Sequence, residues 1–271
     1  MCDHCGCENS DPFQVHPGPG IHPAHEAHAQ VPQDSWHAHT APDGSVSWHS
    51  HGGHGAQPIL AANQRQAALN RDEFRARGVL ALNLVSSPGS GKTTLLRATL
   101  DRLMPRVGCA VVVGDLQTQA DAEALRPSGA PVVQITTGTV CHLDARMVAA
   151  AVATLPAEGI RLLLIENVGN LVCPASFDLG EAHRIVLLAT TEGENKPLKY
   201  PPIFHGARAV VISKTDLAQP AGFQIEHARQ AIAQVAPQAE IIELSARTGE
   251  GLAAWISLLE RLLAPASPEI P

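Results

Sequence analysis

The chain has 271 residues, of which 45% are hydrophobic and 3% aromatic, and its formal net charge is −7. A negative chain without a basic cluster argues against a nucleic-acid partner, because phosphate neutralisation supplies most of that affinity. We find neither a signal peptide nor an apolar run of the roughly 18 residues that a membrane span needs, so we expect a cytoplasmic protein without a membrane partner.

Three cysteines, Cys2, Cys5 and Cys7, lie within the first seven residues. A thiolate cluster on a chain end can close around one soft or borderline metal ion. A disulfide is the alternative, but the other cysteines lie in different surroundings and cytoplasmic thiols stay reduced. We therefore predict a metal site here, with the terminal amine or His4 as a further candidate ligand.

Residues 1–57 hold ten of the fourteen histidines, much proline and glycine and almost no aliphatic run. Such a segment buries too little apolar surface to offset its ordering entropy, so we predict a disordered tail. Short chelating patterns in it favour several weakly bound nickel or zinc ions, and a solvated linker is the alternative. The patterns are His37-x-His39 and His49-x-His51-x-x-His54.

From residue 58 to residue 265 aliphatic runs alternate with helical stretches, starting with an expected helix over Gln57–Arg77, and residues 266–271 form a Pro-rich tail. This alternation predicts a three-layer α/β domain whose mostly parallel sheet is covered on both faces. Ligands of such domains bind at the carboxyl ends of the strands. The expected strands are Gly78–Val85, Cys109–Val113, Pro131–Ile135, Arg161–Ile165, Arg184–Ala189, Ala207–Ile212 and Ala239–Glu243.

A glycine-rich segment joins the first of these strands to a helical stretch, Leu95–Leu103. Strand, glycine-rich loop and helix in this order are typical of the phosphate-binding loop of P-loop nucleoside triphosphatases. We expect Lys92 to reach the terminal phosphates and the Thr93 hydroxyl to ligate Mg²⁺. Ser86 stands where the usual pattern has its first glycine. The loop reads Ser86-Ser87-Pro88-Gly89-Ser90-Gly91-Lys92-Thr93-Thr94.

Acidic residues follow two of the later strands. Asp115 comes after the second strand, and Glu166 opens a Glu-Asn-Val-Gly turn that ends at Gly169. Each acid alone could be an ordinary loop carboxylate. Together with Lys92 and Thr93, however, we expect Asp115 and Glu166 to form the catalytic set that holds magnesium, and Gly169 to sense the γ-phosphate.

Two later loops indicate which nucleotide base the protein binds. Asp216, in Ser213-Lys214-Thr215-Asp216, can accept hydrogen bonds from N1–H and the 2-amino group of guanine, whereas adenine offers no such paired donors. Ser213 replaces the asparagine of the usual N-K-x-D pattern, so we expect weaker bracing of the loop and an unchanged base. Ser245 and Ala246, in Ser245-Ala246-Arg247, fit a second guanine-binding turn. The sequence therefore favours GTP over ATP.

Over essentially all of its length the chain resembles the HypB family of hydrogenase nickel-incorporation GTPases. The resemblance implies a GTPase that helps deliver nickel to the large subunit of [NiFe] hydrogenase, forms a homodimer with GTP and metal, and works beside a nickel- and zinc-binding chaperone of the HypA type. It further implies that Cys2, Cys5 and Cys7 form a tight nickel site. The motifs that carry the resemblance are Cys2-x-x-Cys5-Gly6-Cys7, the His-rich tail, the phosphate loop, Gly138–Asp144, Glu166–Pro174 and Thr191–Pro201.

The resemblance also assigns a second metal site to Cys141, His142 and Cys173. Independently, Cys141-His142 lies where a strand is expected to give way to a helix near Leu143, and both zinc and nickel accept such a ligand set. The alternative is two small buried thiols and a helix-terminal histidine. We assign Cys109 to the core.

Cys173 lies four residues after Gly169, so we expect metal and nucleotide to act on the same segment. GTP should change the affinity of the inner site for metal, and bound metal should change GTP turnover.

Asn170 stands where some regulatory GTPases have a glutamine, and no arginine finger is evident, so we expect slow hydrolysis. Lys196 or Lys199 could serve a neighbouring subunit's nucleotide, or lie in a solvated loop. The competing functions are a nickel-storage protein with weak GTPase activity and a urease-accessory-type GTPase.

Overall fold

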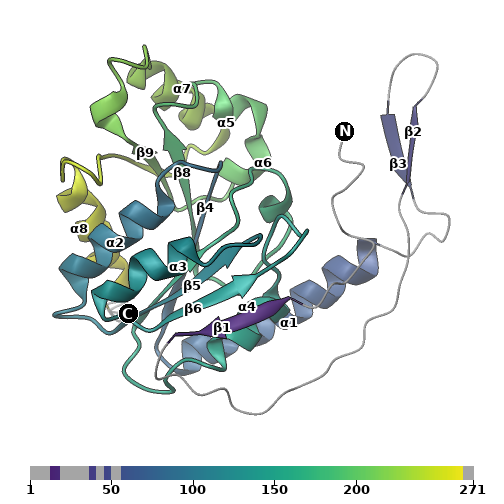
Figure 1. Cartoon of the computed structure of the whole chain (residues 1–271). Helices are drawn as coiled ribbons and strands as arrows, with labels where there is room; N and C mark the ends of the chain where they lie inside the picture. The colour runs from purple at the N-terminus through teal and green to yellow at the C-terminus, as the bar shows by residue number, and fades with distance from the viewer. Residues whose placement is uncertain (1–12, 19–36, 41–45, 50–55, 265–271) are drawn as a thin grey trace, which may run out of the picture.

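The computed structural model describes residues 13–18, 37–40, 46–49 and 56–264. In these ranges an eight-stranded sheet lies between two layers of helices (Figure 1), with the strand order β1-β6-β5-β7-β4-β8-β9-β10. Neighbouring strands are parallel except for the pair of β1 with β6. The predicted three-layer α/β fold is confirmed. The strands are β1 (Gln14–Pro17), β4 (Leu80–Ser86), β5 (Cys109–Asp115), β6 (Val132–Thr136), β7 (Leu162–Glu166), β8 (His183–Ala189), β9 (Ala209–Ser213) and β10 (Glu240–Glu243).

Helices cover both faces of the sheet. One face packs against α2 (Lys92–Leu103), α3 (Ala120–Leu125) and α8 (Leu252–Leu263) through a single leucine-rich cluster. The opposite face has two clusters, one with α1 (Ala56–Ala76) and α4 (Ala145–Val152), the other with α6 (Pro201–Phe204) and α7 (Ile225–Val235). The short helix α5 (Lys196–Lys199) lies against α7.

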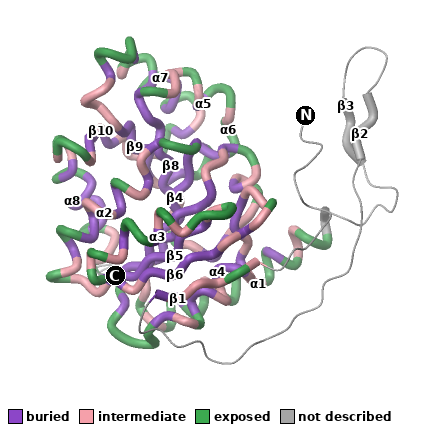
Figure 2. Tube along the Cα trace, in the orientation of Figure 1, coloured by how far each residue is buried: buried purple, intermediate pink, exposed green. Residues whose placement is uncertain are grey.

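The central strands are continuous apolar runs because both of their faces are covered. In β4, for example, Leu82 and Leu84 join the α2 and α8 cluster, whereas Ala81 joins the α1 and α4 cluster. Figure 2 shows the sheet as the most buried part of the molecule. Polar groups that follow these strands therefore gather at one edge, where the carboxyl ends of the parallel strands meet.

Strand β1 lies inside the tail that we predicted to be disordered. It pairs antiparallel with the edge strand β6, with Gln14 opposite Thr136 and Pro17 opposite Val133. Phe13 and Val15 are partly buried and pack against the α1 and α4 cluster, so their apolar side chains extend this cluster at the edge of the sheet. The prediction of disorder is therefore wrong for Gln14–Pro17.

The tail contains one further described feature, a hairpin of β2 (His37–Thr40) and β3 (Val46–His49), which pair antiparallel. Cys2, Cys5, Cys7, His51 and His54 lie outside the described residues. Across the part of the chain that is described, no helix is both long and apolar enough to cross a membrane.

Candidate functional site

The phosphate loop leaves the carboxyl end of β4 and enters α2 as predicted. Gly89 and Gly91 have φ angles of 71° and 95°, which are in the region that favours glycine. The helix begins at Lys92, so its first free amides and its dipole point at the loop. The loop thus has the geometry of an anion-binding cradle. Among its residues Ser87, Ser90 and Lys92 are buried, Gly91 and Thr93 are intermediate, and Pro88, Gly89 and Thr94 are exposed.

Ser86, which replaces the first glycine of the usual pattern, is fully buried beneath this cradle. Its Oγ accepts a hydrogen bond from Lys92 Nζ at 3.0 Å and lies 2.5 Å from Ser90 Oγ. Burial lowers the pKa of Lys92, and the nearby Glu166 carboxylate opposes that effect. The serine therefore holds the phosphate-binding lysine inside the loop.

Glu166, at the end of β7, lies beside the first turn of α2. Thr93 Oγ1 lies 2.9 Å from Glu166 Oε1 and 2.9 Å from Asp121 Oδ1. Burial raises the pKa of Glu166 to about 7, while the charge of Lys92 opposes the rise. Glu166 Oε2 is buried without a hydrogen-bond partner. These hard oxygen atoms, one of them unsatisfied, fit a Mg²⁺ ion.

The two aspartates near this group differ in what they contact. Asp115, which we predicted as a magnesium residue, accepts hydrogen bonds from the Gln117 and Thr118 amides at 3.0 and 2.7 Å. These bonds lower its pKa, although burial acts in the opposite direction. Asp121 instead contacts the Thr93 hydroxyl directly. Asp121 was not among the predicted site residues, and its only signal in the sequence is its acidic side chain, which lies in the first turn of α3.

The predicted guanine-binding loops lie side by side after β9 and β10. Asp216 Oδ1 accepts a hydrogen bond from Ser245 Oγ at 2.6 Å, and Asp216 Oδ2 accepts from Arg247. The Ser245 bond lowers the pKa of Asp216 and keeps it a carboxylate. Ala246, next to Ser245, packs against the α2 and α8 cluster.

The first of these two loops, Ser213–Asp216, also contacts the phosphate loop. Ser213 Oγ donates to the Ser90 carbonyl at 2.8 Å, so this serine contacts the phosphate loop, and weaker bracing than with asparagine stays a prediction. Lys214 Nζ donates to the Gly89 carbonyl at 2.6 Å. Among the described non-glycine residues, Lys214 alone has a positive φ, 59°. This rare conformation is held by the contacts of the site.

Lys196 lies against the phosphate loop of its own chain. Its Nζ donates to Ser87 Oγ at 3.0 Å and forms an ion pair with Glu192 at 3.4 Å. We expected Lys196 or Lys199 to be candidates for a neighbouring subunit's nucleotide, and that role stays a prediction. Within one chain Lys196 contacts the phosphate loop, whereas Lys199 is exposed.

The second predicted metal set is assembled beside the nucleotide loops. Cys141 lies in the loop after β6, and Cys173 begins a short 3₁₀ turn after β7. The ligand atoms of Cys141, His142 and Cys173 all lie within 4.8 Å of one another. Helix α4 begins at Ala145, two residues after the predicted start near Leu143, because Asp144 caps it.

The charge state of this set suits a metal cation. Cys141 Sγ lies 3.1 Å from Cys173 Sγ, and this contact, reinforced by His142, lowers the pKa of Cys141. The His142 ring stacks on Phe177 at 3.8 Å, and its buried Nδ1 has no hydrogen-bond partner. Two sulfur atoms and an unsatisfied ring nitrogen fit a zinc or nickel ion.

Cys109 is a core residue, as predicted. Its side chain is buried in β5, and its Sγ donates to the Val107 carbonyl at 3.2 Å. Burial raises the pKa of this thiol to about 11, so it is a poor metal ligand.

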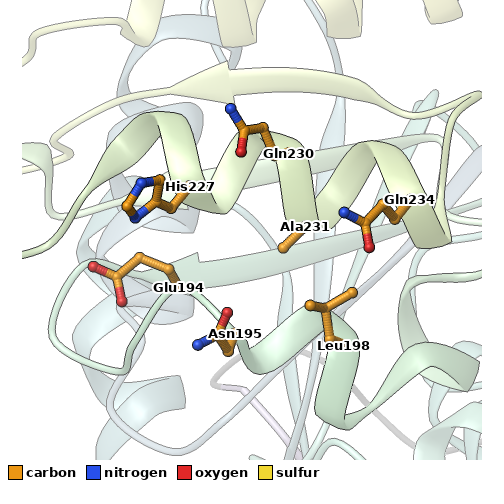
Figure 3. Close-up of a pocket in the computed structure, with 7 residues that line it drawn as sticks. All are labelled: Glu194, Asn195, Leu198, His227, Gln230, Ala231 and Gln234. Atoms are coloured by element: carbon orange, nitrogen blue, oxygen red, sulfur yellow. The ribbon is translucent and has the colours of Figure 1, made fainter.

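A surface pocket of about 200 Å³ lies between α5 and α7 (Figure 3). Glu194, Leu198 and His227 are among its lining residues, and none of them was predicted as a site residue. The predicted nucleotide-site residues lie instead on the loops at the carboxyl ends of the strands.

The parallel sheet, phosphate loop, Thr93–Glu166 pair and Asp216 loop define a P-loop nucleoside triphosphatase of the GTP-binding type. Residues 80–243 match the family described as "CobW/HypB/UreG, nucleotide-binding domain". The hydrogenase maturation factor HypB of Escherichia coli K12 is 52% identical over 202 residues, which cover 74% of this chain and 70% of that protein. The chain belongs to the HypB family.

More distant relatives agree with this placement. The probable hydrogenase maturation factor HypB of Methanocaldococcus jannaschii is 41% identical over 206 residues, covering 76% of this chain and 93% of that protein. The crystal structure of HypB from Helicobacter pylori in complex with nickel has 40% identity and a TM-score of 0.70, covering 74% and 95% of the two chains. The family resemblance of the sequence is thus confirmed.

Proposed function

We propose that this protein is a metallochaperone GTPase that supports nickel insertion into [NiFe] hydrogenase, with GTP·Mg²⁺ controlling the metal bound by Cys141, His142 and Cys173. The observation that carries the proposal is the junction of the two sites. Asn170, directly after Gly169, donates from Nδ2 to the Cys141 carbonyl at 3.3 Å. A loop that responds to the γ-phosphate therefore contacts the metal loop directly.

The chemistry of GTP hydrolysis follows from the residues around the phosphate loop. Lys92 and the amides at the start of α2 stabilise negative charge on the phosphates, while Thr93 and Glu166 hold the magnesium that shares this charge. Asp216 selects guanine. No arginine lies among the contacts described for the phosphate loop, so unassisted hydrolysis should be slow, on the order of 10⁻⁴ to 10⁻³ s⁻¹.

The partners proposed for this activity are a second copy of the chain, a HypA-type nickel and zinc chaperone and the hydrogenase large subunit, in the cytoplasm. The relatives' names support the hydrogenase role, and the nickel complex of the Helicobacter pylori protein supports the cargo. Cys2, Cys5 and Cys7 are proposed as a nickel supply site. Gln14, the first residue of β1, lies opposite Thr136 at the end of β6, and Cys141 follows in the next loop.

A turnover assay tests the proposal. GTP hydrolysis and dimerisation should both respond to added Ni²⁺ or Zn²⁺ in a chain with Cys2, Cys5 and Cys7 changed to serine. Adding Cys141→Ser and Cys173→Ser should remove the response. The matched control is Cys109→Ser, which changes a buried thiol outside the metal set. Absence of GTP turnover would favour the storage function instead.

A further inference from the structure

Asn167 is a buried amide between Glu166 and the metal loop, and neither site uses it as a ligand. Its side chain is 1% exposed. Oδ1 accepts two hydrogen bonds, from the Leu143 amide at 3.1 Å and from the Val168 amide at 2.9 Å. Leu143 directly follows His142. The side chain thus joins the nucleotide loop to the metal loop across 24 residues of sequence.

A second buried amide, Asn83, accepts a hydrogen bond from the other side of the Asn167 side chain. Because backbone N–H groups can only donate, the oxygen of Asn167 must face Leu143 and Val168, and its NH₂ group then faces β4. There Nδ2 donates to Asn83 Oδ1 at 3.2 Å, and Asn83 Nδ2 donates to Glu181 Oε1 at 3.0 Å. Asn83 is fully buried, on the strand that leads into the phosphate loop.

We infer that Asn167 is the positioning residue through which the nucleotide state sets the geometry of the Cys141, His142 and Cys173 site. If the γ-phosphate moves the backbone between Glu166 and Gly169, Oδ1 moves with it, and the Leu143 amide must follow or lose its acceptor. Such a loss is unfavourable in a buried site. His142 is displaced in turn, since it is joined to Leu143. This inference rests on the proposed coupling of metal and nucleotide.

A neighbouring asparagine supplies a matched control. Asn70 on α1 is equally buried and donates from Nδ2 to the Ala145 carbonyl at 2.8 Å and to the Leu179 carbonyl at 2.9 Å. It therefore fixes the start of α4, three residues after His142, without a described contact to the nucleotide loop. Replacing either asparagine should make the metal loop less rigid. Only the replacement of Asn167 should change the coupling between nucleotide state and metal affinity.

The test measures the Zn²⁺ dissociation constant of the full chain with Cys2, Cys5 and Cys7 changed to serine, first in GDP and then in a non-hydrolysable GTP analogue. We expect these two constants to differ by about fivefold or more. Asn167→Ala should bring their ratio within about twofold of one, whereas Asn70→Ala should retain the ratio. Asn167→Asp, which keeps the acceptor oxygen, should restore most of it.

The outcomes distinguish failure of the proposed coupling from failure of the role of Asn167. A ratio of one in the parent chain overturns the proposed coupling itself. A large ratio in the parent chain that Asn167→Ala retains overturns the role of Asn167 alone. Should Asn167→Ala fail to bind nucleotide, Asn167→Ser replaces it, because the shorter side chain cannot reach the Leu143 amide as Oδ1 does. A retained ratio in Asn167→Ser would likewise contradict the inference.

Discussion

Gly169 lies so close to Pro88 that a β-carbon at position 169 would stand 2.8 Å from the Pro88 α-carbon. No real β-carbon tolerates that distance to a backbone atom, so the packing of these two loops requires glycine. The residue expected to sense the γ-phosphate therefore touches the phosphate loop, and four residues later the same segment supplies Cys173. The segment from Gly169 to Cys173 therefore takes part both in the packing against the phosphate loop and in the candidate metal site.

Gly169→Ala should separate these two loops. We expect affinity for a GTP analogue to fall about tenfold, equivalent to about 1.4 kcal/mol, and affinity for GDP to change by less. The reason is that only the triphosphate needs the loop in contact with Pro88. Fluorescent-nucleotide titration measures both constants. Val172→Ala, at a 61% exposed position of the same segment, is the control, and an equal effect of both variants would contradict the account.

Asp216→Asn should weaken GTP binding by about a hundredfold, because the amide replaces one acceptor with a donor that faces the guanine 2-amino group. Xanthosine triphosphate, which has an oxygen at position 2, should then compete better than GTP. Competition binding against both nucleotides measures this. The control is Arg247→Ala, which removes a partner of the carboxylate and leaves its acceptors in place. Unchanged GTP preference in Asp216→Asn would exclude this base contact.

Lys196→Ala should slow GTP hydrolysis about tenfold without preventing dimerisation, because the ammonium group beside Ser87 can stabilise charge on the phosphates. Mixing this variant with Lys92→Ala shows which chain's nucleotide Lys196 serves. If Lys196 serves its own chain, as the Ser87 contact indicates, the mixture stays slow. In an equal mixture half of the dimers combine the two variants, and each of these has one complete site. Recovery of turnover toward about a quarter of the original rate would therefore show that Lys196 acts on the neighbouring subunit.

A chain that starts at Gln57 should bind several fewer Ni²⁺ ions, because it lacks the N-terminal thiols and ten histidines. Equilibrium dialysis of this chain beside the full-length protein measures the difference. Its inner site should still bind one ion, since Cys141, His142 and Cys173 remain. If the number of bound ions does not change, the tail is a linker only.

Local patterns were sufficient to predict most of the fold. Two-sided burial produces continuous apolar strands, and the glycines of the phosphate loop are placed by steric rules that hold within a few residues. Helix α2 begins at Lys92, three residues before the expected Leu95, but its end at Leu103 and the end of β4, one residue from the expected Val85, followed from sequence. The short strand β1 did not. Its four residues gain stability only by pairing with β6, more than 110 residues away, and nothing local indicates that pairing.

The same limit applies to the site. Lys92, Thr93, Glu166 and Asp216 belong to short motifs, so their chemistry could be predicted. The contact of Asp121 with Thr93 depends on how α3 packs beside α2 and spans 28 residues of sequence. Lys196 reaches Ser87 across 109 residues. Contacts of this kind come from the three-dimensional packing of the loops, which the alternation of strands and helices does not specify.

The most direct test of the account is the affinity of the inner metal site in two nucleotide states. In a chain with Cys2, Cys5 and Cys7 changed to serine, Ni²⁺ binding should be measured by competition with a chromophoric chelator, in GDP and in a non-hydrolysable GTP analogue. The account predicts dissociation constants that differ about fivefold or more, and GTP affinity that changes by the same factor when metal is added. Equal nickel affinities in the two nucleotide states would contradict it.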